Sequence, residues 1–146
     1  MRKEVAYGKI AIPFIWVGCV GAISFLEAWL KFTAPGVTLT IGLSIGKVVF
    51  AALNKVELTF AVLLALPWLF KRKIDWGTEV FYLVALAILI LQSVWLLPLL
   101  SSHIDIYLAG KLPPPSNAHI NFVVLEAVKL ISLLLYGFKL LATWKL

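Results

Sequence analysis

Four long apolar segments, separated only by short polar or proline-containing stretches, make up most of this 146-residue chain. A helix needs about 20 apolar residues to cross a bilayer, so a chain of this length has room for roughly four spans and little else. The composition agrees, because only 14% of the residues are charged, whereas soluble domains carry roughly a quarter. We therefore expect an all-α integral membrane four-helix bundle with short loops, which forms one transmembrane domain over residues 1–146.

The limits of the spans follow from residues that interrupt the apolar runs. Pro35-Gly36 ends the first run, the basic stretch Lys71-Arg72-Lys73 ends the second, and Pro113-Pro114-Pro115 marks 101–117 as the one real loop. The predicted spans are about 10–32, 38–70, 77–100 and 118–143.

The second run is too long for one perpendicular crossing, and two interpretations compete. Residues 39–53 are either a separate amphipathic helix at the membrane surface or the start of one long helix that reaches Phe70. No Gly or Pro interrupts the sequence from Lys47 to Leu66, which favours the long helix. Gly42 and Gly46 have the spacing of small residues that permits close helix packing.

The positive residues are distributed unequally between the two sides of the predicted bundle. Lys31 and Lys111 fall on one side, and eight fall on the side of the termini: Arg2, Lys3, Lys9, Lys71, Arg72, Lys73, Lys139 and Lys145. Because Lys and Arg are enriched in cytoplasmic loops, both termini are predicted to be cytoplasmic in a plasma or inner membrane. The net charge of +6 is thus explained by membrane topology, and no nucleic-acid partner is expected, since the basic residues form no stripe.

Several ionisable side chains lie inside the predicted spans, where each costs about 2.5–3.5 kcal/mol on the insertion scale. Glu27 and Lys31 are four residues apart and Glu126 and Lys129 three apart, so each pair shares a helix face. A rise of 1.5 Å per residue places Glu27 and Glu126 at a similar depth in the outer half. We expect one polar cluster, in which three acids balance three lysines: Glu27, Lys31, Lys47, Asn54, Glu57, Glu126 and Lys129.

Two interpretations of this cluster remain open. Ionisable residues in a membrane commonly mark a site for an ion, a proton or a small polar ligand. They also form neutral ion pairs that only hold helices together. Lys31 and Lys47 can in addition extend their ammonium groups to the membrane surface.

The two histidines suggest a second candidate site. The loop 101–117 is expected to bring His103 and Asp105 towards His119, and imidazole with carboxylate suits zinc, copper or iron. The alternative is that both histidines are interfacial residues in contact with water. No cofactor is indicated, and the single cysteine, Cys19, excludes an intramolecular disulfide.

These features favour a small transporter or channel-like protein that handles an ion or small polar solute through the charged cluster. The alternative is a structural or assembly subunit of a larger membrane complex. An enzyme is a third class, in which Glu27, His119 and Glu126 would perform acid–base chemistry. Besides the lipid bilayer, we expect a second copy of the chain or a larger membrane complex as partner, because four helices are few for a solitary transporter.

A resemblance rests on the stretch from Gly21 to Gly36, GAISFLEAWLKFTAPG, which is followed by a long apolar segment with a polar middle. The chain resembles small four-helix bacterial membrane proteins of a domain-of-unknown-function family related to the eukaryotic transmembrane-205 type. The matching places are Ala34-Pro35, the segment from Lys47 to Glu57 and His119-Ile120-Asn121. The resemblance implies a four-helix membrane fold and no settled activity.

Overall fold

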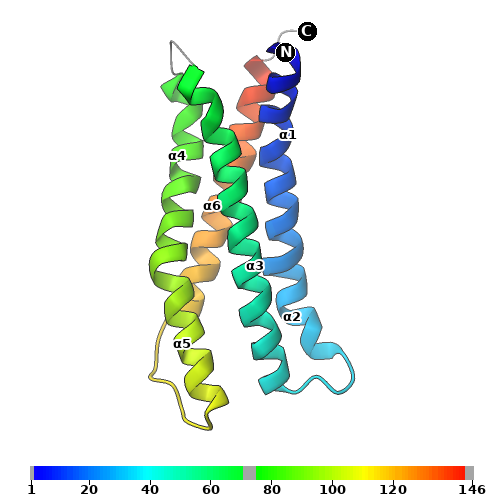
Figure 1. Cartoon of the computed structure of the whole chain (residues 1–146), viewed down its shortest axis with the longest axis vertical. Coiled ribbons are helices and arrows are strands. Elements are labelled where there is room, and N and C mark those ends of the chain that lie inside the picture. The colour runs from blue at the N-terminus through cyan, green and yellow to red at the C-terminus, as the bar shows by residue number, and fades with distance from the viewer. Residues whose placement is uncertain (1, 71–74, 144–146) are drawn as a thin grey trace.

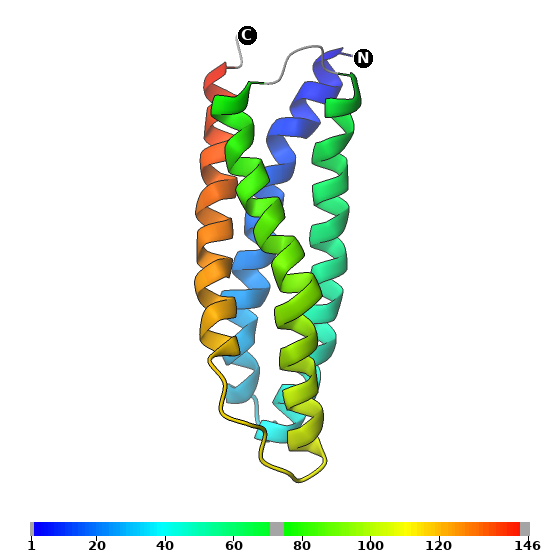
Figure 2. The same cartoon turned by 90° about the vertical axis from the view of Figure 1, so that its left-hand side faces the viewer.

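The computed structural model describes residues 2–70 and 75–143, which form a bundle of four long helical spans (Figure 1). Each span is long and apolar enough to cross a membrane: Tyr7–Thr33, Leu39–Trp68, Trp76–Leu108 and Ala118–Thr143. Both chain termini lie at one end of the bundle, here called the terminal end (Figures 1 and 2). The opposite end, with the connections 34–38 and 109–117, is the loop end. The predicted all-α bundle with four candidate membrane spans is confirmed.

The first span is one continuous rod built from several helix types. It runs through α1 (Arg2–Val20), the π-helix η1 (Gly21–Glu27), α2 (Ala28–Leu30) and the 3₁₀ turn η2 (Lys31–Thr33). Ala34 is extended, as expected for a residue before proline, and Gly36 has a φ of 81°. A glycine suits this left-handed turn because it has no Cβ.

The second span confirms the long-helix interpretation. A single helix, α3 (Leu39–Ala65), is followed by the 3₁₀ segment η3 (Leu66–Phe70). The Thr38 hydroxyl accepts a hydrogen bond from the Ile41 N–H at 3.3 Å and so caps the start of α3. A Cβ at Gly42 would overlap the Phe32 ring, so the predicted close packing at this glycine is confirmed.

The third span is longer than predicted and ends beyond Leu100. It comprises α4 (Trp76–Leu91), the π-helix η4 (Gln92–Leu96) and α5 (Leu97–Leu108), so the loop is 109–117 and not 101–117. The polar residues Ser101, Ser102 and His103 do not stop a helix. The first residue that does is Gly110, whose φ is 75°. His103 and Asp105 are therefore helical.

The fourth span, α6 (Ala118–Thr143), has the predicted limits and packs against α1 and α4. The main apolar core fills the terminal half of the bundle; among its fully buried members are Trp16, Leu64, Tyr82, Leu133 and Tyr136. A smaller core of Leu96, Ala118 and Phe122 lies towards the loop end. The predicted basic turn at Lys71-Arg72-Lys73, like Lys145, lies outside the described residues.

Candidate functional site

A buried polar network occupies the middle of the bundle. The Lys129 ammonium on α6 lies 2.5 Å from Glu57 Oε1 on α3 and 2.8 Å from Glu126 Oε2. It also donates a hydrogen bond to Gln92 Oε1 in η4 at 2.8 Å. Glu57, Gln92, Glu126 and Lys129, each no more than 3% exposed, are called the central network.

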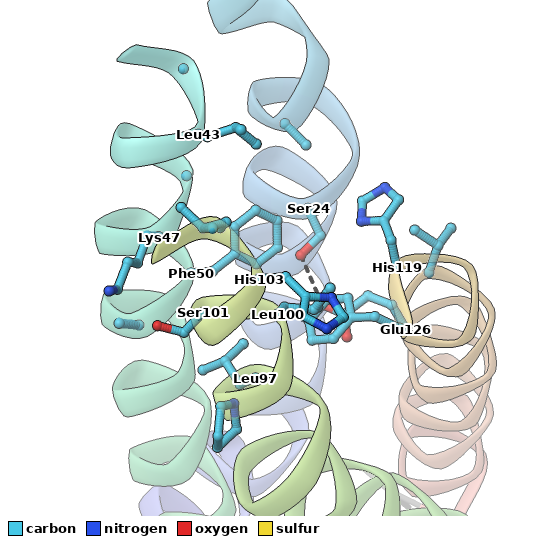
Figure 3. A pocket seen from close by; sticks show the side chains of 18 of the residues that line it. Ser24, Leu43, Lys47, Phe50, Leu97, Leu100, Ser101, His103, His119 and Glu126 are labelled. Atoms are coloured by element: carbon cyan, nitrogen blue, oxygen red, sulfur yellow. Dashed lines mark hydrogen bonds between the residues drawn. The ribbon is translucent and has the colours of Figure 1, made fainter. Parts of the chain in front are cut away.

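The first span completes the central network. The Trp16 indole N–H donates to Glu57 Oε1 at 2.8 Å, and the Ser24 hydroxyl donates to Glu126 Oε1 at 2.8 Å (Figure 3). Gln92 Nε2 donates to the other oxygen, Glu126 Oε2, at 2.7 Å. Glu126 thus accepts from three of the four spans, its own included, and all four spans meet through this network.

The charges of the central network do not balance. It holds two carboxylates, Glu57 and Glu126, and within residues 2–70 and 75–143 both pair with the same ammonium, that of Lys129. A buried charge in a membrane span is costly unless it is compensated. The three-against-three balance predicted for a single cluster is replaced by two carboxylates around one ammonium, a formal excess of one negative charge.

Two π-helical segments supply hydrogen-bond donors to Glu126. Within the described part of the chain, π-helix occurs in η1 and η4, and these segments contain Ser24 and Gln92. Such segments are rare in proteins and are frequently found at functional sites. Their coincidence at one carboxylate marks Glu126 as the centre of the candidate site.

A cavity of about 620 Å³ opens between η1, α3, α5 and the start of α6 in the loop-end half. Its wall is mostly apolar and includes Phe25, Phe32, Phe50, Leu97 and Phe122, together with a few polar groups. Figure 3 shows Glu126 and Ser24 bonded to each other in this wall. The volume lies within the range of about 300–1,000 Å³ that is typical of small-molecule sites.

The seven residues of the predicted cluster are divided among four places. Glu57, Glu126 and Lys129 meet in the central network, as expected. Lys31 pairs with Glu27 within the first span at 3.2 Å, and Asn54 donates to Ser93 at 2.6 Å. Lys47 pairs with Asp105 at 2.5 Å near the loop end.

Glu27 lies outside the central network, in contrast to the single cluster predicted from the sequence. The first-span residue that contacts Glu126 is Ser24, while Glu27 faces Lys31. The wider turn of the π-helix η1 changes the angle between Ser24 and Glu27 around the helix, which a count of α-helical residues does not anticipate.

The predicted metal site of His103, Asp105 and His119 is not assembled. Among the described residues, no three His, Cys, Asp or Glu side chains are placed to hold a metal ion. Because α5 continues through Leu108, the His103 and Asp105 side chains point about 160° apart, as residues at positions i and i+2 of an α-helix do. Asp105 binds Lys47, whereas His103 and His119 both line the cavity.

A second polar cluster at the terminal end was missed from the sequence. Lys9 Nζ lies 2.7 Å from Glu79 Oε1, and the Tyr136 hydroxyl donates to Glu79 Oε2 at 3.0 Å. Glu79 could have been identified from the sequence, because it is a carboxylate in an apolar run. Gln92 could have been identified in the same way, as an amide in an apolar run. Trp16 and Ser24 offered no such signal, because either residue is unremarkable in a membrane helix.

Comparison of the chain with protein-family models, with curated proteins and with solved structures found no match.

Proposed function

We propose that this chain is a small multi-pass membrane transporter that binds a small solute in the loop-end cavity. The observation that carries the proposal is that Glu126 belongs both to the cavity lining and to the central network. Glu126 is one of the residues that line the cavity, and its carboxylate is part of the central network, which joins all four spans. A solute that interacts with Glu126 therefore acts on contacts between the spans.

The packing supports a carrier over an open pore. The cavity lies in the loop-end half, whereas the terminal half of the described bundle is filled by fully buried side chains such as Leu64, Tyr82 and Tyr136. A solute that enters from the loop end meets this packed core. Transport then requires that the spans move relative to one another, and the central network is the contact that a bound solute alters.

The setting of the proposed transporter follows from charge and size. The excess of Lys and Arg that the sequence predicts on the side of the termini supports cytoplasmic termini and a cavity that faces the outside in a plasma or inner membrane. A bundle of four spans offers few surfaces for rearrangement, so the proposal includes a second copy of the chain or a larger membrane complex as partner.

The competing function is that of a scaffold, and one observation favours it. Lys129 is fully buried, and its three contacts with Glu57, Gln92 and Glu126 satisfy the ammonium group. A purely structural network is expected to satisfy its lysine in this way. A scaffold function gives no reason for the cavity beside Glu126 or for the second carboxylate.

A panel of organic cations, neutral molecules and anions of similar size tests the proposal. A ligand that binds the folded state raises its stability by RT ln(1 + [L]/Kd), so binding is read as a rise in the melting temperature of the purified protein. We expect at least one compound to stabilise the wild type and Leu91→Trp, which changes a lipid-facing residue. The same compound should not stabilise Leu97→Trp, which fills the cavity from the same span.

Ala51→Trp, placed in the cavity wall on α3, repeats the block in case Leu97→Trp does not fold. A panel without any stabilising compound contradicts the proposal. So does a compound that stabilises the blocked variants as well as it stabilises Leu91→Trp.

A further inference from the structure

We infer that the loop-end cavity takes an organic monocation with an apolar body, whose positive charge lies beside Glu126. This inference rests on the proposed function, because it names the class of solute for the same cavity. It is carried by the charges, the apolar wall and the set of donor and acceptor groups around the cavity.

The charges of the cavity wall favour a cation. Lys31 and Lys47 are the lysines in the wall, and each has its own carboxylate, Glu27 at 3.2 Å and Asp105 at 2.5 Å. Figure 3 shows the Lys47 ammonium turned away from the cavity. The third charged group in the wall, Glu126, shares its lysine with Glu57. In formal charges one negative charge is therefore left over, and Glu126 is the carboxylate of the central network that lines the cavity.

The wall also favours a large organic cation over a metal ion. The cavity is lined by Phe25, Phe32, Phe50 and Phe122, and aromatic faces attract organic cations. The Lys31 ammonium already lies 5.8 Å from the centre of the Phe50 ring. Hard metal ions instead require several oxygen ligands, and the described side chains offer no group of three acidic, His or Cys ligands here.

The polar groups of the wall match the same ligand. The Glu126 carboxylate is the anionic group, and His103 and His119 lie in the wall nearer the loop end. In their neutral form these imidazoles accept hydrogen bonds from N–H groups of a solute. An organic anion would instead place its charge next to Glu126, which is a repulsive arrangement.

Three probes of closely related shape test the inference: tetraphenylphosphonium, triphenylphosphine oxide and tetraphenylborate. Binding is measured by equilibrium dialysis of the full chain in nanodiscs of zwitterionic lipid, with empty nanodiscs subtracted. We expect the affinity for the cation to be higher than that for the neutral and anionic probes by about tenfold or more. The reason is that only the cation compensates the negative charge of Glu126.

Two matched variants test whether the charge of Glu126 is responsible for cation binding. Glu126→Gln keeps the shape and hydrogen bonding of the side chain and removes its charge, so cation binding should fall by about tenfold or more. Glu79→Gln makes the same change at another buried carboxylate, remote from the cavity, and should leave cation binding unchanged. The wild-type preference among the three probes remains decisive if Glu126→Gln does not fold.

The outcomes separate this inference from the proposed function. If the neutral or anionic probe binds as well as the cation and Leu97→Trp blocks it, the cavity is a solute site and the inferred cation class is wrong. Cation binding that survives Glu126→Gln overturns the role of Glu126. Absence of binding by every probe, or binding that survives Leu97→Trp, contradicts both the inference and the solute cavity on which it rests.

Discussion

The side-chain oxygen of Gln92 accepts a hydrogen bond from the Lys129 ammonium at 2.8 Å, between the π-helix η4 and α6. The amide nitrogen of Gln92 donates to Glu126 at 2.7 Å, so one neutral residue contacts both members of an ion pair. The two charges fix the orientation of the amide. Gln92 therefore connects the third span to the centre of the bundle.

We expect Gln92→Leu to destabilise the protein by about 1.5–3 kcal/mol or more, because a hydrogen bond to a charged group contributes that much and both partners stay buried. The measurement is a denaturant titration in detergent. Val94→Leu, which changes a side chain that is 74% exposed on the same π-helix, is the control and should have little effect. Equal stability of Gln92→Leu and wild type would show that this amide does not hold the network.

Lys129→Met should cost about 3–5 kcal/mol, because it leaves two buried carboxylates without a cation. Lys47→Met is the matched change at a lysine whose ion pair is solvent-accessible, and such pairs contribute about 0–1 kcal/mol. Unfolding titrations of both variants should show this difference. A similar loss in the two variants would contradict the burial argument.

The orientation is tested with single cysteines in a Cys19→Ala background. Lys111→Cys at the loop end should react with a membrane-impermeant thiol reagent added to intact cells. Thr143→Cys at the terminal end should react only after the cells are opened. The reverse pattern would place the cavity on the cytoplasmic side.

The spans were predictable because hydropathy and helix-breaking residues are local properties of the sequence. The limits of α6 were predicted correctly, and the pairing of Glu126 with Lys129 follows from their spacing of three residues. The end of the third span was predicted too early, because the polar residues after Leu100 were taken for a loop although no helix-breaking residue occurs before Gly110.

The partners across helices were not predictable in the same way. Whether Ser24 or Glu27 reaches Glu126 depends on the local helix type, and hydrophobic periodicity does not reveal a π-helix. Trp16 and Gln92 reach the network because of how neighbouring helices are aligned along the bundle axis. A single sequence does not specify this alignment. For the same reason, the balance of three acids and three lysines was wrong for the buried part of the site.

The central claim is that the charges of the central network bind a solute and do not only hold the helices together. Its most direct test combines Glu57→Gln, Glu126→Gln and Lys129→Met, which removes every charge of the network while nearly preserving its volume. Replacing a buried ion pair by apolar residues of similar volume is often close to neutral for stability. In this variant the methionine is apolar and the two glutamines can still form hydrogen bonds, so it should melt near the wild-type temperature. The deciding measurement is tetraphenylphosphonium binding to this folded variant. The account predicts that affinity falls by about tenfold or more, and wild-type affinity in the uncharged network would contradict it.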